Sequence, residues 1–212
     1  MIAGTPTMYS YCLFVETGKE LLLKAGLQQI LPSSTVLFPT CIFHTYKDGR
    51  WIDQRQPIFK SYLFVFQNEP LDVSIVLRQR PLGIIKFLRN NNGTYELQGS
   101  DKAFSDLVWK TQGHLDAASV IEEEKVFKFA DPLFENIDAQ IVMVSRRRGN
   151  IQVEFRLDGK TSRVWMKYTL QTPAAEKKAK SEAHSPAEPV ADTDPVGYTV
   201  VNYDELVDTD SP

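Results

Sequence analysis

The sequence has little of what would place it in a membrane or an oxidising compartment. No run of about 18 uncharged apolar residues occurs, so we expect no membrane contact. The N-terminal segment lacks the basic opening and apolar core of a secretory signal. Two cysteines, Cys12 and Cys41, are too few for a disulfide framework and fit a reducing compartment. We therefore expect a cytoplasmic protein.

Motifs typical of enzymes are also missing. The three histidines, His44, His114 and His184, lie far apart and show no metal-binding spacing such as H-E-x-x-H. No G-x-x-x-x-G-K-[ST] phosphate loop and no G-x-S-x-G nucleophile turn occurs. Cys12 and Cys41 fall in β-prone apolar runs, where core positions are more typical than nucleophiles. These absences favour a binding protein over an enzyme, and we expect no catalytic residues, no metal and no cofactor.

The formal net charge of −3 combines two segments of opposite sign. Residues 1–172 carry 21 basic and 18 acidic side chains, whereas residues 173–212 carry 3 basic and 9 acidic ones. The acidic segment has almost no large apolar residue before Tyr198, so we predict a disordered acidic tail over 172–212. A short docking peptide around Tyr198, or an intramolecular cover for a basic surface, is the alternative. The body of the protein is therefore mildly basic and compatible with a nucleic-acid partner.

The first part of the chain alternates β-prone runs with amphipathic helices. Strands are predicted over Tyr9–Val15, Thr35–Thr45, Ser61–Phe66 and Ile84–Leu88, with a polar hairpin over Tyr46–Gln56 that turns at Asp48-Gly49. Helices are predicted over Lys19–Leu31, from Pro70 to a point before Pro81, and after a cap at Ser100 or Asp101. Thr17 and Glu20 have the spacing of a capping box. This order predicts an antiparallel sheet with helices packed on it.

The second part of the chain has an all-β pattern. Short strands are predicted over Lys125–Phe129, Gln140–Ser145, Ile151–Leu157 and Arg163–Tyr168. We expect an α+β protein with a first domain over 8–112, a linker over 113–124, a small barrel over 125–171 and the tail over 172–212. Nothing in the pattern indicates an oligomer, and we expect a monomer.

An aromatic block, Pro57 to Phe66, precedes and includes the third predicted strand. Because strand residues alternate between faces, Tyr62, Phe64 and Phe66 should share one face, and Leu63 and Val65 the other. One face must pack on the helices. The other face, together with Tyr9 and Tyr11 of the first strand, is expected to expose an aromatic patch suited to a partner. The alternative is that all of these side chains are core.

A basic turn lies in the predicted barrel. Seven basic and two acidic residues occur between Ile141 and Gln171, and three of the basic ones are consecutive. Guanidinium groups on a turn can bind phosphate oxygens or stack on unpaired bases. The predicted RNA-binding residues are Arg146, Arg147, Arg148, Arg156, Arg163 and Lys167. A solvated turn that only maintains solubility is the alternative.

Taken in order, these segments are similar to the NusG family of transcription elongation factors over about Met8 to Gln171. The segment from Phe59 to Val65 resembles the family's FPGYVFV, and Pro39 stands where the family has a proline in its second strand. The stretch from Asp131 to Val144 resembles a KOW module, which implies that the small barrel is SH3-like. Thr17-Gly18-Lys19-Glu20 and the RRRG turn bring the chain closer to the specialised LoaP paralogues. Departures include Lys60-Ser61 in place of Pro-Gly, and Asp131, Asn136 and Ala139 in place of KOW glycines.

The resemblance implies a role in transcription elongation or antitermination. It implies that the first domain binds RNA polymerase and suppresses pausing or termination in selected operons, with Phe59 and Tyr62 as anchors and Tyr9 and Tyr11 extending the patch. It implies that the KOW module contacts nascent RNA, such as a leader hairpin. It also places a partner contact, such as a ribosomal protein, at the KOW tip residues Leu133, Phe134 and Ile137. The alternative function is a protein-interaction adaptor whose barrel binds a protein without affinity for RNA.

Overall fold

The structure is a computed structural model that describes residues 8–79, 83–90 and 92–171. Its first sheet has four antiparallel strands in the order β2-β5-β1-β6. They are β1 (Tyr9–Val15), β2 (Thr35–Leu37), β5 (Tyr62–Gln67) and β6 (Ile84–Phe87). The predicted first and third strands therefore lie side by side at the centre of this sheet. The predicted acidic tail falls outside the described residues.

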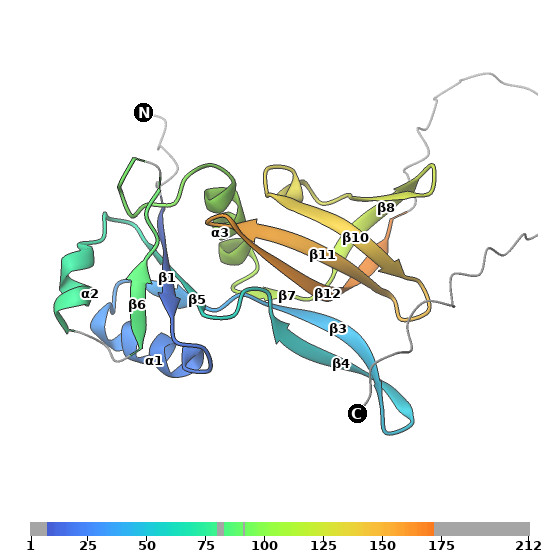
Figure 1. Ribbon diagram of the computed structural model, residues 1–212, viewed down its shortest axis with the longest axis horizontal. Coiled ribbons are helices and arrows are strands. Elements are labelled where there is room, and N and C mark those ends of the chain that lie inside the picture. Colours follow the sequence, from blue (N-terminus) through green and yellow to red (C-terminus); the bar gives the residue numbers. More distant parts are fainter. Residues whose placement is uncertain (1–7, 80–82, 91, 172–212) are drawn as a thin grey trace, which may run out of the picture. The chain divides into compact units, whose positions relative to one another are not determined.

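Each face of this sheet has its own apolar cover (Figure 1). Helices α1 (Glu20–Ile30) and α2 (Val73–Gln79) contribute Leu23, Leu27 and Val76 to a cluster with Leu63 and Val65 of β5. Helix α3 (Gly99–Lys110) contributes Phe104, Leu107 and Val108 to a second cluster that contains Tyr62, Phe64 and Phe66. The alternation predicted for β5 is thus confirmed, and both of its faces are buried.

A second, three-stranded sheet carries a long hairpin. Its order is β4-β3-β7, with β3 (Thr40–Lys47), β4 (Arg50–Pro57) and β7 (His114–Leu115). The hairpin turns at Asp48 and Gly49, whose φ angles of 51° and 78° match the left-handed conformation of a two-residue turn. The hairpin that the sequence predicts is therefore confirmed at its turn.

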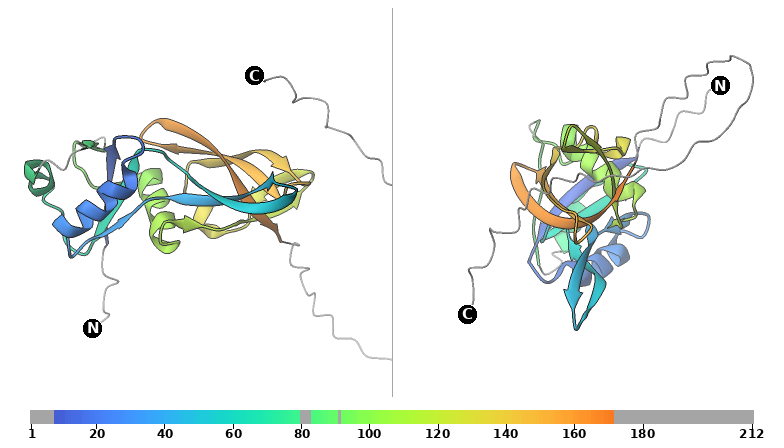
Figure 2. Two further views of the ribbon diagram at one scale, coloured as in Figure 1. Left: turned by 90° about the horizontal axis from the view of Figure 1, so that it is seen from below. Right: turned by 90° about the vertical axis from the view of Figure 1, so that its right-hand side faces the viewer.

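The last sheet is barrel-like. Its five strands have the order β10-β11-β12-β8-β9. They are β8 (Ala118–Glu123), β9 (Val126–Phe129), β10 (Ala139–Ser145), β11 (Asn150–Leu157) and β12 (Lys160–Leu170), with a short 3-10 helix η1 (Pro132–Phe134). Every pair is antiparallel except β12 with β8. Figure 2 shows these strands curving into a nearly closed barrel. The predicted α+β class is confirmed.

Residues 113–124, where the sequence predicts a linker, contain β7 and β8. The segment Ala118 to Val120 alternates buried and half-buried side chains and pairs with Tyr168 to Leu170 of β12. Helix α3 also joins the first sheet to the barrel through Phe104. The Phe104 ring centroid lies 5.4 Å from that of Phe59 and 5.6 Å from that of Phe155 on β11. The first sheet and the barrel therefore share one apolar cluster.

The start of α1 differs from the predicted capping box. The hydroxyl of Thr17 lies 2.6 Å from Ser61 Oγ and does not cap the helix. Glu20 is the first helical residue, and its nearly buried carboxylate accepts hydrogen bonds from Gly18 N (2.8 Å) and Ser61 N (2.9 Å). Ser61 stands where the family pattern has glycine, and its φ of 69° keeps the left-handed conformation that glycine adopts most easily. Glu20 thus ties the helix to the turn before β5.

We predict that Glu20→Ala lowers the free energy of unfolding by about 2 kcal/mol, because the buried Ser61 N–H loses its acceptor. Chemical denaturation at neutral pH measures the change. Glu16→Ala is the control, since Glu16 is half-exposed in a surface pair with Lys19 and should change stability by less than about 0.5 kcal/mol. Equal effects of the two substitutions would show that the Glu20 contacts are not stabilising.

Candidate docking and nucleic-acid surfaces

The aromatic side chains predicted to anchor a partner are buried in this structure. Phe59 and Tyr62 are each 3% exposed. Their rings pack on each other at 5.7 Å, and Phe59 also packs on Phe104 of α3. The prediction of an exposed patch is therefore wrong for this arrangement, because α3 and the barrel cover the face that α1 and α2 leave free.

Tyr9 and Tyr11 do not belong to that face. Tyr11 pairs with Val65 across the sheet, so its side chain lies on the α1 and α2 side. The hydroxyl of Tyr11 accepts a hydrogen bond from Leu71 N at 2.8 Å, and burial raises its pKa. Tyr9 packs against the same cluster. The sequence-based grouping of these tyrosines with Phe59 and Tyr62 is wrong, because it matched strands by composition and not by register.

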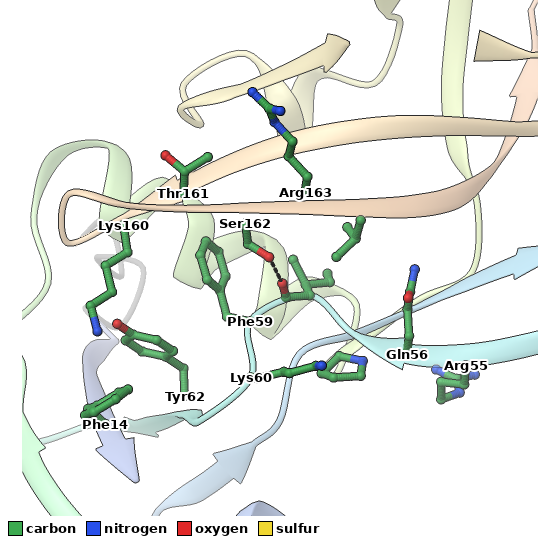
Figure 3. A pocket seen from close by; sticks show the side chains of 13 residues that line it. Phe14, Arg55, Gln56, Phe59, Lys60, Tyr62, Lys160, Thr161, Ser162 and Arg163 are labelled. Carbon is green, nitrogen blue, oxygen red and sulfur yellow. Dashed lines mark hydrogen bonds between the residues drawn. The ribbon is translucent and has the colours of Figure 1, made fainter. Parts of the chain in front are cut away.

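A cleft of about 610 Å³ runs along the edge of the buried aromatic face (Figure 3). One wall is the segment from Arg55 to Tyr62, and the other is the start of β12 from Lys160 to Val164. The Lys160 ammonium lies over the Phe14 ring, 4.2 Å from its centroid. The Tyr62 hydroxyl is buried without a hydrogen-bond partner among the described residues, and burial raises its pKa to about 12. The cleft is therefore the place where the covered face comes nearest to solvent.

The two walls are held together by hydrogen bonds between the hairpin segment and the barrel. The Asn150 side chain, 2% exposed, accepts from His44 N (2.8 Å) and donates to His44 O (2.7 Å). Ser162 donates to Ile58 O (2.5 Å) and Gln56 donates to Trp165 O (2.6 Å). Lys167 also pairs with Asp53 at 3.1 Å. These contacts hold the barrel against the aromatic face.

Four of the six predicted RNA-binding side chains already have acidic partners. Arg146 pairs with Glu122 and lies over the Phe127 ring, and Lys167 pairs with Asp53. Arg156 and Arg163 both bind Glu154. Arg147 and Arg148 are exposed and form no ion pair within the described part of the chain. Among the six predicted residues, the two without an acidic partner therefore both lie at the tip of the β10–β11 turn.

Glu154 is a nearly buried carboxylate on β11. It accepts from Arg163 Nε (2.7 Å), from an Arg156 guanidinium nitrogen (3.1 Å) and from Gln140 Nε2 (3.1 Å). The hydrogen bond from Arg163 holds the pKa of Glu154 below its ordinary value of 4.5, although desolvation acts in the opposite direction. Arg156 and Arg163 therefore both donate hydrogen bonds to Glu154, while more than half of each side chain stays exposed.

A carboxylate with a lowered pKa stabilises the folded state above its ordinary pKa and loses that effect as the pH falls through its folded pKa. We predict that Glu154→Gln is less stable than the parent at pH 7. The difference should shrink as the pH falls below about 4. Thermal unfolding between pH 3 and pH 7 measures it. Glu135→Gln, at an exposed position, is the control, and a difference that stays constant with pH would contradict the assigned role of the ion pairs.

The predicted partner contacts at the KOW tip are mostly buried. Phe134 is 4% exposed and stacks on Phe129 with ring centroids 4.1 Å apart. Ile137 is 6% exposed, and Leu133 is half-buried. The tip therefore packs into the shared core through η1, on the side of α3.

Two exposed aromatic side chains were not singled out from the sequence. Tyr46 and Trp51 flank the turn of the β3–β4 hairpin, and their ring centroids are 5.4 Å apart. They were part of a segment interpreted only as polar. The sequence did contain a signal for the pair. With the turn at Asp48-Gly49, residues at equal distances before and after the turn pair across the hairpin, which places Tyr46 opposite Trp51.

Within the described residues, no group of three or more His, Cys, Asp and Glu side chains could hold a metal ion. No described helix is long and apolar enough to cross a membrane.

Comparison with known proteins finds similarity among solved structures. Neither a protein-family model nor a curated protein matches the chain. Among solved structures, the chain is similar to one described as "Domain interaction in Thermotoga maritima NusG". The TM-score is 0.44 and the identity 14%, over 76% of this chain and 94% of that chain.

Proposed function

We propose that the protein is a transcription elongation or antitermination factor that binds RNA polymerase through residues 8–112 and suppresses pausing or termination in selected operons. The barrel, from β8 to β12, contacts nascent leader RNA. The observation that carries the proposal is the part of the aromatic face formed by Phe59 and Tyr62, which lies in the motif that resembles the NusG family, is not covered by α1 or α2, and lines a cleft with the start of β12. Specialisation of the LoaP type is supported by the free Arg147 and Arg148 at the RRRG turn.

Docking through this face requires the barrel to move away from it. Phe59 and Tyr62 are buried beneath contacts that the hairpin and the barrel make with each other. A partner that binds only the uncovered form has an apparent affinity reduced by the fraction of molecules that are uncovered. Weakening the fastening contacts should therefore strengthen polymerase binding.

We predict that Asn150→Ala combined with Ser162→Ala raises the affinity for RNA polymerase about tenfold or more. The substitutions remove three hydrogen bonds between barrel and hairpin, each contributing about 1 kcal/mol. Titration of labelled polymerase with the full chain measures the affinity.

Asn90→Ala is the matched control. Asn90 makes equivalent hydrogen bonds to Thr94 and Glu96, but within a single loop of the first domain. This control should leave polymerase binding unchanged. Unaltered binding by the Asn150 and Ser162 variant, with its fold retained, would show that polymerase does not use the covered face.

For RNA, we predict that Arg147→Ala with Arg148→Ala weakens binding and makes its salt dependence shallower. Loss of two phosphate contacts should reduce the slope of log K against log salt by about 1.4 for a single strand. Filter binding at several salt concentrations measures the slope. Lys24→Ala with Lys110→Ala, on helices α1 and α3 of the first domain, removes the same charge and should leave the slope unchanged.

An adaptor function for the barrel is the second candidate. Val142 and Met143 are 39% and 53% exposed on β10, which stands at one end of the strand order of the barrel sheet. An exposed apolar edge strand can pair with an extended peptide. Absence of RNA binding by the full chain, together with capture of a ribosomal protein, would favour this function.

A further inference from the structure

The tip of the β3–β4 hairpin exposes an aromatic pair. Tyr46 is 61% exposed and Trp51 is 46% exposed. They are the only aromatic residues among the exposed large apolar side chains of the described part of the chain. Their rings pack edge to face, which holds both rings in fixed positions without burying them. Exposed rings held in this way offer π-faces to a ligand.

The register of the hairpin places this pair two residues beyond the part of the hairpin that contacts the barrel turn. Tyr46 pairs with Trp51 and His44 pairs with Asp53, so all four side chains lie on one face of the hairpin. The inner end of that face contacts the barrel, because Lys167 pairs with Asp53 and a Cβ built on Gly149 would lie 3.6 Å from the His44 imidazole. Figures 1 and 2 show the hairpin tip and the β10–β11 turn at the same end of the folded body.

The hairpin tip and the barrel turn together carry more positive than negative charge. Lys47 and Arg50 form the pair between the two rings and the Asp48-Gly49 turn, with their side chains on the opposite face of the hairpin. Arg147 and Arg148 lie on the β10–β11 turn just before Gly149. Asp53 is occupied by Lys167 and by His44 Nδ1, at 3.1 Å and 2.5 Å. Asp48 is the remaining carboxylate at the tip. An anionic ligand with flat apolar groups fits this combination better than an apolar peptide does.

We propose that the hairpin tip and the arginine turn form one binding surface for single-stranded RNA. Tyr46 and Trp51 stack on unpaired bases, while Arg147 and Arg148 bind the flanking phosphates. Bases in a duplex are already stacked on each other and cannot use the rings, so the surface selects single strands, loops or bulges. The proposal rests on the RNA contact proposed for the barrel, and it adds the ligand class and two residues from the first part of the chain.

The stacking contribution and the phosphate contribution can be measured separately. Tyr46→Ala with Trp51→Ala should weaken binding of a labelled single-stranded RNA by the full chain about tenfold or more. The salt slope should be unchanged, because no phosphate contact is lost. Tyr46→Phe with Trp51→Phe keeps an aromatic ring at each position and should retain most of the affinity. A blunt RNA duplex of the same sequence should bind equally to all three proteins.

Leu21→Ala with Leu22→Ala is the matched control, since these α1 side chains are 70% and 71% exposed and their loss removes apolar surface elsewhere. It should leave RNA binding unchanged. If the parent binds RNA and needs Arg147 and Arg148, but the Tyr46 and Trp51 double alanine variant binds equally well, the stacking proposal alone is overturned. If the parent binds no RNA, the proposed RNA contact itself fails. A shallower salt slope in the aromatic variant would also overturn the assignment of stacking.

Discussion

The packing of Phe104 between two sheets determines how the rest of the molecule is arranged. Its ring is fully buried and meets Phe59 and Phe64 on one side and Phe155 of the barrel on the other. A buried phenylalanine removes roughly 150–250 Å² from water. Full burial of one such ring stabilises the folded state by about 1.5–3 kcal/mol. Helix α3 therefore belongs to both cores, and separation of the barrel would expose aromatic surface on both sides.

Local residue patterns predicted most strands and helices. Which face of the sheet each side chain occupies depended on how the strands pair. The runs Tyr9–Val15 and Ser61–Phe66 were recognisable because β-branched and aromatic residues cluster there. Because Tyr11 pairs with Val65, the side chains of Tyr9 and Tyr11 lie on the other face of the sheet from Tyr62. Amino-acid composition carries no information about this pairing. Residues 118–123 were interpreted as linker, because the turn to the adjacent strand β9 is formed by Glu124 and Lys125, which have positive φ angles without the usual glycine or asparagine. The other partner, β12, lies about fifty positions away along the chain.

The basic surface illustrates a second limit of sequence reasoning. Arg146 is neutralised by Glu122, and Arg163 by Glu154, on neighbouring strands. Counting charges along the chain indicated a basic segment after Ile141, but with β8 included the barrel, residues 118–171, carries 9 basic and 8 acidic side chains. The count also could not separate arginines that pair with carboxylates from those that do not. Only the pairing of strands shows that Arg147 and Arg148 remain available. It also brings them near Tyr46 and Trp51, which stand about a hundred residues earlier.

The position of Cys41 has a chemical consequence. Its thiol is fully buried on β3 and donates to Trp165 O of the barrel at 3.6 Å, and burial raises its pKa to about 12. A thiol in this state is almost never a thiolate at neutral pH and does not react with electrophiles. Lifting the barrel from the hairpin would hydrate it and return its reactivity. The rate at which Cys41 is alkylated therefore reports how often the barrel separates from the hairpin.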